Sequence, residues 1–205
     1  MHIDQTNLSS IWRGTALCLG FLVACRPAPS STTPPKDSAE SSEMSAGMTT
    51  VDLVTHDGWS LIDAGADPYP SHRTPTYTCD QRGVVPEDGV LEINTNDCGY
   101  ALLGQPILSD IQAGDRVELL MYHSALASTE ATAEAHFSLW LGPHEFWGRT
   151  VAIPAAAEVY PVPLEVDFDL AAGSPAIIHL HNHGGNSWRV ASLRRSRTDD
   201  ADTYR

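Results

Sequence analysis

The sequence has little positive charge and lacks the motifs of the common enzyme classes. Its 205 residues include 12 Lys+Arg against 26 Asp+Glu, which gives a formal net charge of −14 at pH 7. Affinity for nucleic acid comes mostly from basic side chains that neutralise phosphates, so this balance argues against a nucleic-acid partner. The chain also has no Gly-x-Ser-x-Gly, no phosphate-cradling glycine loop and no dinucleotide fingerprint. These absences favour a non-enzymatic role.

The chain also lacks, near its amino terminus, an apolar run long enough to cross a bilayer. The run at residues 14–24 has 11 residues, whereas a spanning helix needs about 20. It follows Arg13 and stops at Cys25, and this layout is typical of the apolar region of a signal peptide. Residues 1–24 are therefore predicted to be an export signal.

The residues Leu22-Val23-Ala24-Cys25 resemble the lipobox of bacterial lipoproteins. The resemblance implies cleavage before Cys25, a diacylglycerol on its thiol and acylation of the new amino terminus. Several acyl chains make a stable membrane anchor. Arg26 stands where an Asp favours inner-membrane retention in enteric lipoproteins, so the resemblance implies an outer-membrane protein that faces the periplasm or the cell surface. The alternative is ordinary secretion with cleavage near Ala28.

The composition divides the rest of the chain into three parts. Residues 25–50 are rich in Pro, Ser and Thr and contain no aromatic residue, so they are predicted to form a disordered tether that begins at the lipidated Cys25. Residues 51–195 are long enough to bury a core and are predicted to be the folded domain. Residues 196–205 are predicted to be a disordered charged tail.

Only four cysteines occur. Cys18 lies in the signal and Cys25 is the lipid attachment site, so Cys79 and Cys98 remain for the exported domain. Two thiols in an exported domain predict a disulfide, and closing a loop of about 20 residues contributes about 3 kcal/mol. The alternative, a catalytic thiol, is disfavoured because neither residue has a Cys-x-x-Cys partner or a basic cluster beside it.

From Thr50 onward the apolar residues recur with a period of two, which is typical of strands with one buried face. Turn signals such as Asp88-Gly89 separate the strands. The candidate strands are Val51–Val54, Val90–Asn94, Ala101–Ile107, Val117–His123, Ala133–Leu141, Phe146–Ile153, Leu164–Leu170, Ala176–His181 and Trp188–Leu193. About nine short strands without a convincing helix predict an all-β fold, namely an antiparallel β-sandwich or jelly roll.

Two stretches, at residues 111–119 and 170–178, share an apolar residue, Ala-Gly, two turn residues and a strand. A closing hairpin over Ile177–Leu193 is predicted to turn at residues 182–186. This spacing over residues 85–195 resembles galactose-binding-like jelly rolls, the architecture of many carbohydrate-binding modules. The resemblance implies a ligand-binding or interaction role, with a carbohydrate or another envelope component, such as an envelope protein, as partner.

Three histidines, His179, His181 and His183, alternate along one strand and its end, so their imidazoles are predicted to share a face. Zinc is bound by imidazole nitrogen, and a third ligand from a neighbouring strand, His123 or His136, would complete a site. No cofactor is identified outright, and zinc or another divalent metal is the candidate. The second functional hypothesis is therefore a metal-binding protein or a metal-dependent hydrolase. The alternative is that these histidines lie on a polar face and are satisfied by water or neighbours.

Aromatic residues suggest a different site. Trp140 is predicted to lie on the polar face of its strand, and Trp188 and Arg189 lie near a strand end. A tryptophan beside polar groups can stack on a sugar ring while those groups bind its hydroxyls. The alternative is that Trp140 is buried. The leading hypothesis is a membrane-anchored, non-enzymatic lipoprotein with a ligand-binding β-sandwich.

Overall fold

The computed structural model describes residues 47–75 and 78–198. The predicted signal, Cys25, most of the predicted tether and residues 199–205 lie outside the described residues. In the described part, no helix is long and apolar enough to cross a membrane. Its helical segments are three 3-10 turns, η1 (Ala64–Ala66), η2 (Pro70–His72) and η3 (Gln81–Gly83).

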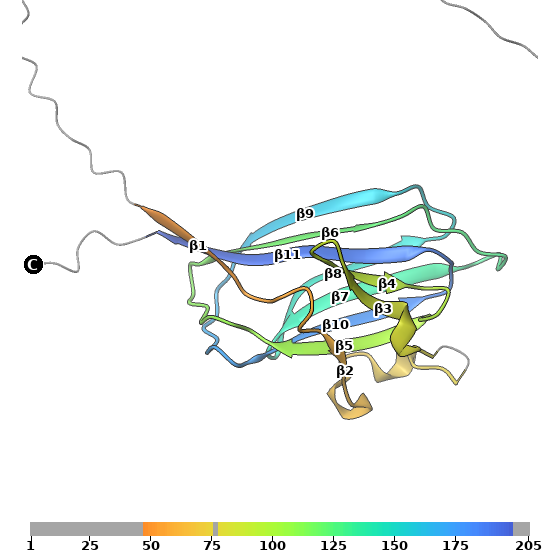
Figure 1. Cartoon of the computed structure of the whole chain (residues 1–205), viewed down its shortest axis with the longest axis horizontal. Coiled ribbons are helices and arrows are strands. Elements are labelled where there is room, and N and C mark those ends of the chain that lie inside the picture. The colour runs from red at the N-terminus through yellow and green to blue at the C-terminus, as the bar shows by residue number, and fades with distance from the viewer. Residues whose placement is uncertain (1–46, 76–77, 199–205) are drawn as a thin grey trace, which may run out of the picture. The chain divides into compact units, whose positions relative to one another are not determined.

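The domain is an antiparallel β-sandwich of jelly-roll type, which confirms the predicted fold class (Figure 1). A six-stranded sheet has the order β3-β4-β11-β6-β9, with β1 also paired to β11, and a five-stranded sheet has the order β2-β5-β10-β7-β8. The six-stranded sheet consists of β1 (Met48–Asp52), β3 (Val84–Glu87), β4 (Val90–Asn94), β6 (Arg116–His123), β9 (Glu158–Glu165) and β11 (Ser187–Thr198). The five-stranded sheet consists of β2 (Ser60–Leu61), β5 (Tyr100–Pro106), β7 (Glu134–Leu141), β8 (His144–Ala152) and β10 (Pro175–Asn182).

The core lies between the two sheets and is filled by the alternating apolar residues. In β6 the side chains of Val117, Leu119 and Met121 are buried, as the period of two predicts. From the five-stranded sheet, Phe137 is fully buried and stacks on Trp188 of β11, with ring centroids 5.6 Å apart. Each sheet therefore has an inner face in the core and an outer face.

The predicted strand Leu164–Leu170 is wrong in its position. The strand is β9, Glu158–Glu165, and it pairs with β6 alone. It contains Pro161 and Pro163, which lack an N–H donor but are tolerated because β9 is an edge strand. Residues after Val166 form a loop, in which Leu170 makes an isolated bridge to Ile111. The similar stretches at residues 111–119 and 170–178 are thus bridged at their first residues, Ile111 and Leu170.

The predicted closing hairpin over Ile177–Leu193 is also wrong. β10 pairs with β5 and β7, whereas β11 pairs with β1, β4 and β6. The turn at residues 182–186 therefore crosses from one sheet to the other. A strand pattern identifies the inner face of each strand, but it does not specify which sheet the next strand joins.

Both predicted domain boundaries shift outward by a few residues. β1 begins at Met48, inside the range 25–50 that was predicted to be tether, and β11 continues to Thr198, inside the predicted tail. The two ends pair with each other in the register Met48 to Thr198. Backbone pairing therefore orders polar residues that have no apolar periodicity.

The predicted disulfide between Cys79 and Cys98 is present. The two residues also form an isolated antiparallel bridge. The loop between them contains η3, β3 and β4, so the disulfide joins the start of β5 to the segment that follows β2.

Candidate functional site

The candidate site lies on the outer face of the five-stranded sheet. The inward residues of β10, Ile178 and Leu180, are fully buried in the core, so His179 and His181 point to the outer face. In the strand register His181 is opposite His136 of β7, and His179 is opposite Ser138. The predicted shared face of His179 and His181 is thus confirmed, and β7 adds His136 to it.

Residues 62–75 cover part of this outer face. The segment includes η1 and η2, and it adjoins β2 at the sheet edge (Figure 1). The Asp63 side chain accepts a hydrogen bond from the Gly65 N–H, and Asp67 accepts one from the Tyr69 N–H. These local bonds stabilise the short turns and direct His72, the last residue of η2, toward the sheet.

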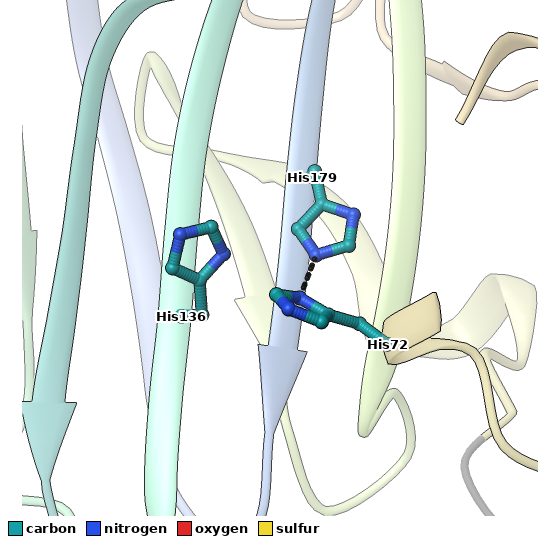
Figure 2. A group of neighbouring side chains, drawn as sticks. All are labelled: His72, His136 and His179. Atoms are coloured by element: carbon teal, nitrogen blue, oxygen red, sulfur yellow. Dashed lines mark hydrogen bonds between the residues drawn. The ribbon is translucent and has the colours of Figure 1, made fainter. Parts of the chain in front are cut away.

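Three imidazoles meet beneath this segment. His72, His136 and His179 each offer one nitrogen, and these nitrogens lie within 4.8 Å of one another. The His72 Nδ1 atom lies 3.2 Å from the His179 Nε2 atom. Figure 2 shows the three rings converging, with His136 and His179 rising from adjacent strands and His72 approaching from the covering segment.

Asp67 fixes the far side of the His179 ring. Its Oδ1 atom lies 3.2 Å from His179 Nδ1, and neither side chain is exposed. The Tyr100 hydroxyl donates a hydrogen bond to Asp67, and the Arg73 guanidinium lies 3.5 Å from the same carboxylate. Burial raises the pKa of Asp67, but the hydrogen bonds from Tyr100 and Tyr69 and the adjacent His179 lower it overall. Asp67 is therefore a carboxylate that orients His179.

The buried imidazoles are uncharged at neutral pH. Burial lowers the pKa of His179 to about 4 even though Asp67 acts in the opposite direction. Burial and the neighbouring histidines lower the pKa of His181 to about 4. Burial and electrostatic repulsion by the neighbouring His72 ring also lower the pKa of His136. A neutral imidazole has a nitrogen lone pair, which is the form that binds a metal ion.

Of the other two predicted metal ligands, His183 lies beside His181 and His123 lies in the core. His183 sits beyond the end of β10, with its Nε2 atom 3.0 Å from His181 Nε2 and its Nδ1 atom 3.2 Å from Glu130. His123 is an inward-facing residue of the six-stranded sheet, 1% exposed, with its Nε2 atom 3.0 Å from the Tyr160 hydroxyl. The prediction that His123 completes the site is wrong, because the core separates it from His179.

Of the three predicted ligand-binding residues, one faces outward on the five-stranded sheet. Trp140 lies on the outer face of β7 and is partly exposed. Trp188 is 0% exposed in the core, where its Nε1–H donates to Asn182 Oδ1 at 3.3 Å. Arg189 lies on the six-stranded sheet, where its Nε–H donates to Glu92 at 2.7 Å. The prediction that Trp188 and Arg189 join Trp140 in one site is wrong.

No sequence pattern predicted a role for His72, Asp67 and Tyr69. All three lie in a proline- and turn-rich stretch with no strand periodicity, and their approach to the sheet depends on how that stretch folds over it. The one available signal was chemical, because a histidine, an aspartate and an aromatic occur within six residues of each other.

No protein-family model matches the chain, and no curated protein matches it. Among solved structures, a family 29 carbohydrate-binding module is 14% identical, with a TM-score of 0.39 over 78% of this chain and 99% of that chain. A carbohydrate-binding module with specific mannan recognition is 10% identical, with a TM-score of 0.43 over 74% and 99%. The cleaved adhesin domain of Lys-gingipain from Porphyromonas gingivalis is 10% identical, with a TM-score of 0.41 over 72% and 100%.

Proposed function

We propose that this chain is a lipid-anchored envelope protein whose β-sandwich binds a carbohydrate without catalysing a reaction. The binding surface in this proposal is the outer face of the five-stranded sheet around Trp140. The observation that carries it is a partly exposed tryptophan held beside a carboxylate on an outer sheet face. An indole ring stacks on the C–H face of a sugar, and a carboxylate accepts hydrogen bonds from its hydroxyls.

The Trp140 ring is held in place from two sides. Its Nε1–H donates to Ser138 Oγ at 3.1 Å. The Tyr69 ring meets it edge-on, with ring centroids 6.0 Å apart. A ring fixed before the ligand arrives loses little side-chain freedom on binding, which favours affinity.

Glu145 supplies the carboxylate. It lies on β8 in register with Trp140 and is exposed. Gly148 follows on the same strand, and a Cβ atom at that position would collide with the Glu145 carboxylate. Burial, together with a hydrogen bond to Glu145, raises the pKa of Tyr69 to about 12, so this hydroxyl stays protonated. The surface thus combines an indole, a carboxylate and a phenol.

The test is glycan binding by the full-length protein, first on a glycan array and then by calorimetry with the glycans that bind. Trp140→Ala should abolish measurable binding, because the stacking surface is lost. Tyr122→Ala is the matched control, since Tyr122 is a partly buried aromatic on the six-stranded sheet and packs near Arg189. It should bind as the wild type does. Absence of glycan binding by the wild type, or equal binding by Trp140→Ala, would contradict the proposal.

The anchored location rests on the lipobox-like residues 22–25 and the tether composition. In this proposal Cys25 holds the protein in the outer membrane, and the tether extends the domain from the bilayer. A carbohydrate or another envelope component is then the natural partner, because those molecules surround the domain.

A further inference from the structure

Beyond carbohydrate binding, the geometry points to a transition-metal site, and we propose that His72, His136 and His179 bind one zinc-type divalent ion. The three imidazoles come from separate elements, η2, β7 and β10. Two nitrogens bound to one tetrahedral zinc ion, each at about 2.0–2.1 Å, are separated by about 3.3 Å. The His72 Nδ1 and His179 Nε2 atoms are 3.2 Å apart, so this pair already has the spacing of two ligands on one ion.

The third ligand needs only a small adjustment. All three candidate nitrogens lie within 4.8 Å of one another, so side-chain movement that shortens the longest separation by up to about 1.5 Å gives the spacing of ligands on one zinc ion. Figure 2 shows a ring nitrogen of His136 on the side facing His179. The His136 Nδ1 atom is buried and makes no hydrogen bond to the described residues. A buried polar atom without a partner is costly, and coordination to a metal ion satisfies it.

Asp67 gives His179 the arrangement found in metal centres. A ligating histidine usually donates its other ring N–H to a carboxylate, which fixes the tautomer and the ring orientation. Asp67 lies 3.2 Å from His179 Nδ1 with both side chains shielded from solvent. The Nε2 lone pair of His179 then points at the cluster. Asp67 is itself held by Tyr100 and Arg73, so it is a positioning residue.

The ligand set identifies the class of ion. Three imidazoles without a carboxylate in direct contact suit zinc and the neighbouring first-row metals, whereas calcium and magnesium require oxygen ligands. Three protein ligands also leave one position of a tetrahedral ion for water or another small ligand. The inference is independent of the carbohydrate proposal, because it does not use Trp140 or Glu145.

The experiment uses the full-length protein, purified in detergent without a polyhistidine tag, stripped with a chelator and then dialysed against Zn²⁺. Mass spectrometry of metal content should find about one zinc per chain. His72→Ala, His136→Ala and His179→Ala should each lose this zinc. His72 lies on the covering segment and not in the core, so its replacement should leave the circular dichroism spectrum unchanged. His56→Ala, at an exposed position, is the matched control and should keep the zinc.

A second measurement tests the positioning role of Asp67. Cobalt titration of the stripped protein should give the intense visible absorption of a tetrahedral Co²⁺ site, and Asp67→Asn should weaken the affinity about 10–100-fold. The proposal is overturned if the wild type takes up no more zinc than His72→Ala. It is equally overturned if the zinc persists in both His72→Ala and His179→Ala. Glycan binding is measured separately, so failure of either proposal leaves the other intact.

Discussion

The residue type says little about exposure, and two of the five tryptophans show why. Trp140 and Trp188 both lie on strands, yet Trp140 is partly exposed on an outer face whereas Trp188 has no exposed surface. The side of the pleat decides this difference, because successive side chains of a strand point to opposite faces. Trp188 therefore contributes to the core with Phe137, and Trp140 keeps part of its side chain exposed.

A buried acidic residue gives a prediction at the same scale. Asp115 is 2% exposed and accepts hydrogen bonds from Arg197 Nε–H at 2.7 Å and from the Gln112 N–H at 2.8 Å. Burial raises the pKa of Asp115, but these hydrogen bonds lower it below 3.8 overall. The ionised Asp115 therefore stabilises the folded protein fully above pH 3.8, the pKa of this group in the unfolded chain. This stabilisation is lost as the pH falls through the pKa of Asp115 in the folded protein, which is lower. Asp115→Asn should lower the free energy of unfolding by about 1.5–3 kcal/mol at pH 7.

The measurement is urea unfolding between pH 3 and 7. The difference between wild type and Asp115→Asn should narrow at the acid end. Asp52→Asn is the control, because Asp52 pairs with Arg194 at 2.8 Å but is exposed. A surface ion pair contributes about 0–1 kcal/mol. If Asp115→Asn were as stable as Asp52→Asn at pH 7, the stabilising role of the buried Asp115 carboxylate would be contradicted.

At the scale of elements, regular strands were predictable and irregular ones were not. The strands at Val90–Asn94 and Val117–His123 follow the predicted alternation. β2 has two residues and β9 contains prolines, so neither has the pattern of a half-buried strand. Pairing with a neighbour orders both of them, and a sequence pattern does not record which neighbour is available.

The disulfide is the element-scale prediction for stability. It closes a loop with a sequence separation of 19 that includes the short strands β3 and β4. Replacing both cysteines, as Cys79→Ser with Cys98→Ser, should lower the free energy of unfolding by about 3 kcal/mol, since the unfolded chain regains loop entropy. Urea unfolding of this variant should match that of the reduced wild type. If the double variant and the reduced wild type both had the free energy of unfolding of the oxidised wild type, the disulfide would not constrain the unfolded chain.

At the scale of the whole molecule, the proposed lipid anchor at Cys25 predicts that the protein carries a fatty acid and stays with the membrane. Metabolic labelling with a palmitate analogue should mark the wild-type protein in the membrane fraction. Cys25→Ser should abolish the label and release the protein, because the proposed attachment thiol is absent. Cys18→Ser is the matched control within the same segment. It should label normally, and labelling of Cys25→Ser equal to the control would refute the anchor.

The sequence alone predicted the all-β fold, the pairing of Cys79 with Cys98 and the shared face of His179 and His181. The fold class and the shared face follow from the period of two, because successive side chains of a strand point to opposite faces. The disulfide follows from elimination, because Cys79 and Cys98 are the cysteines left for the exported domain. The sequence offered His136 and His123 as alternative third ligands, and only the strand pairing showed that His136, on β7, is the one beside β10.

The tertiary structure alone decided which residues complete the site. It placed His72 and Asp67 over the outer face, and it placed His123 and Trp188 in the core. These placements depend on how an irregular segment folds over the sheet and on which sheet each strand joins. Both are set by long-range packing, in which contacts between distant parts of the chain outweigh local preference.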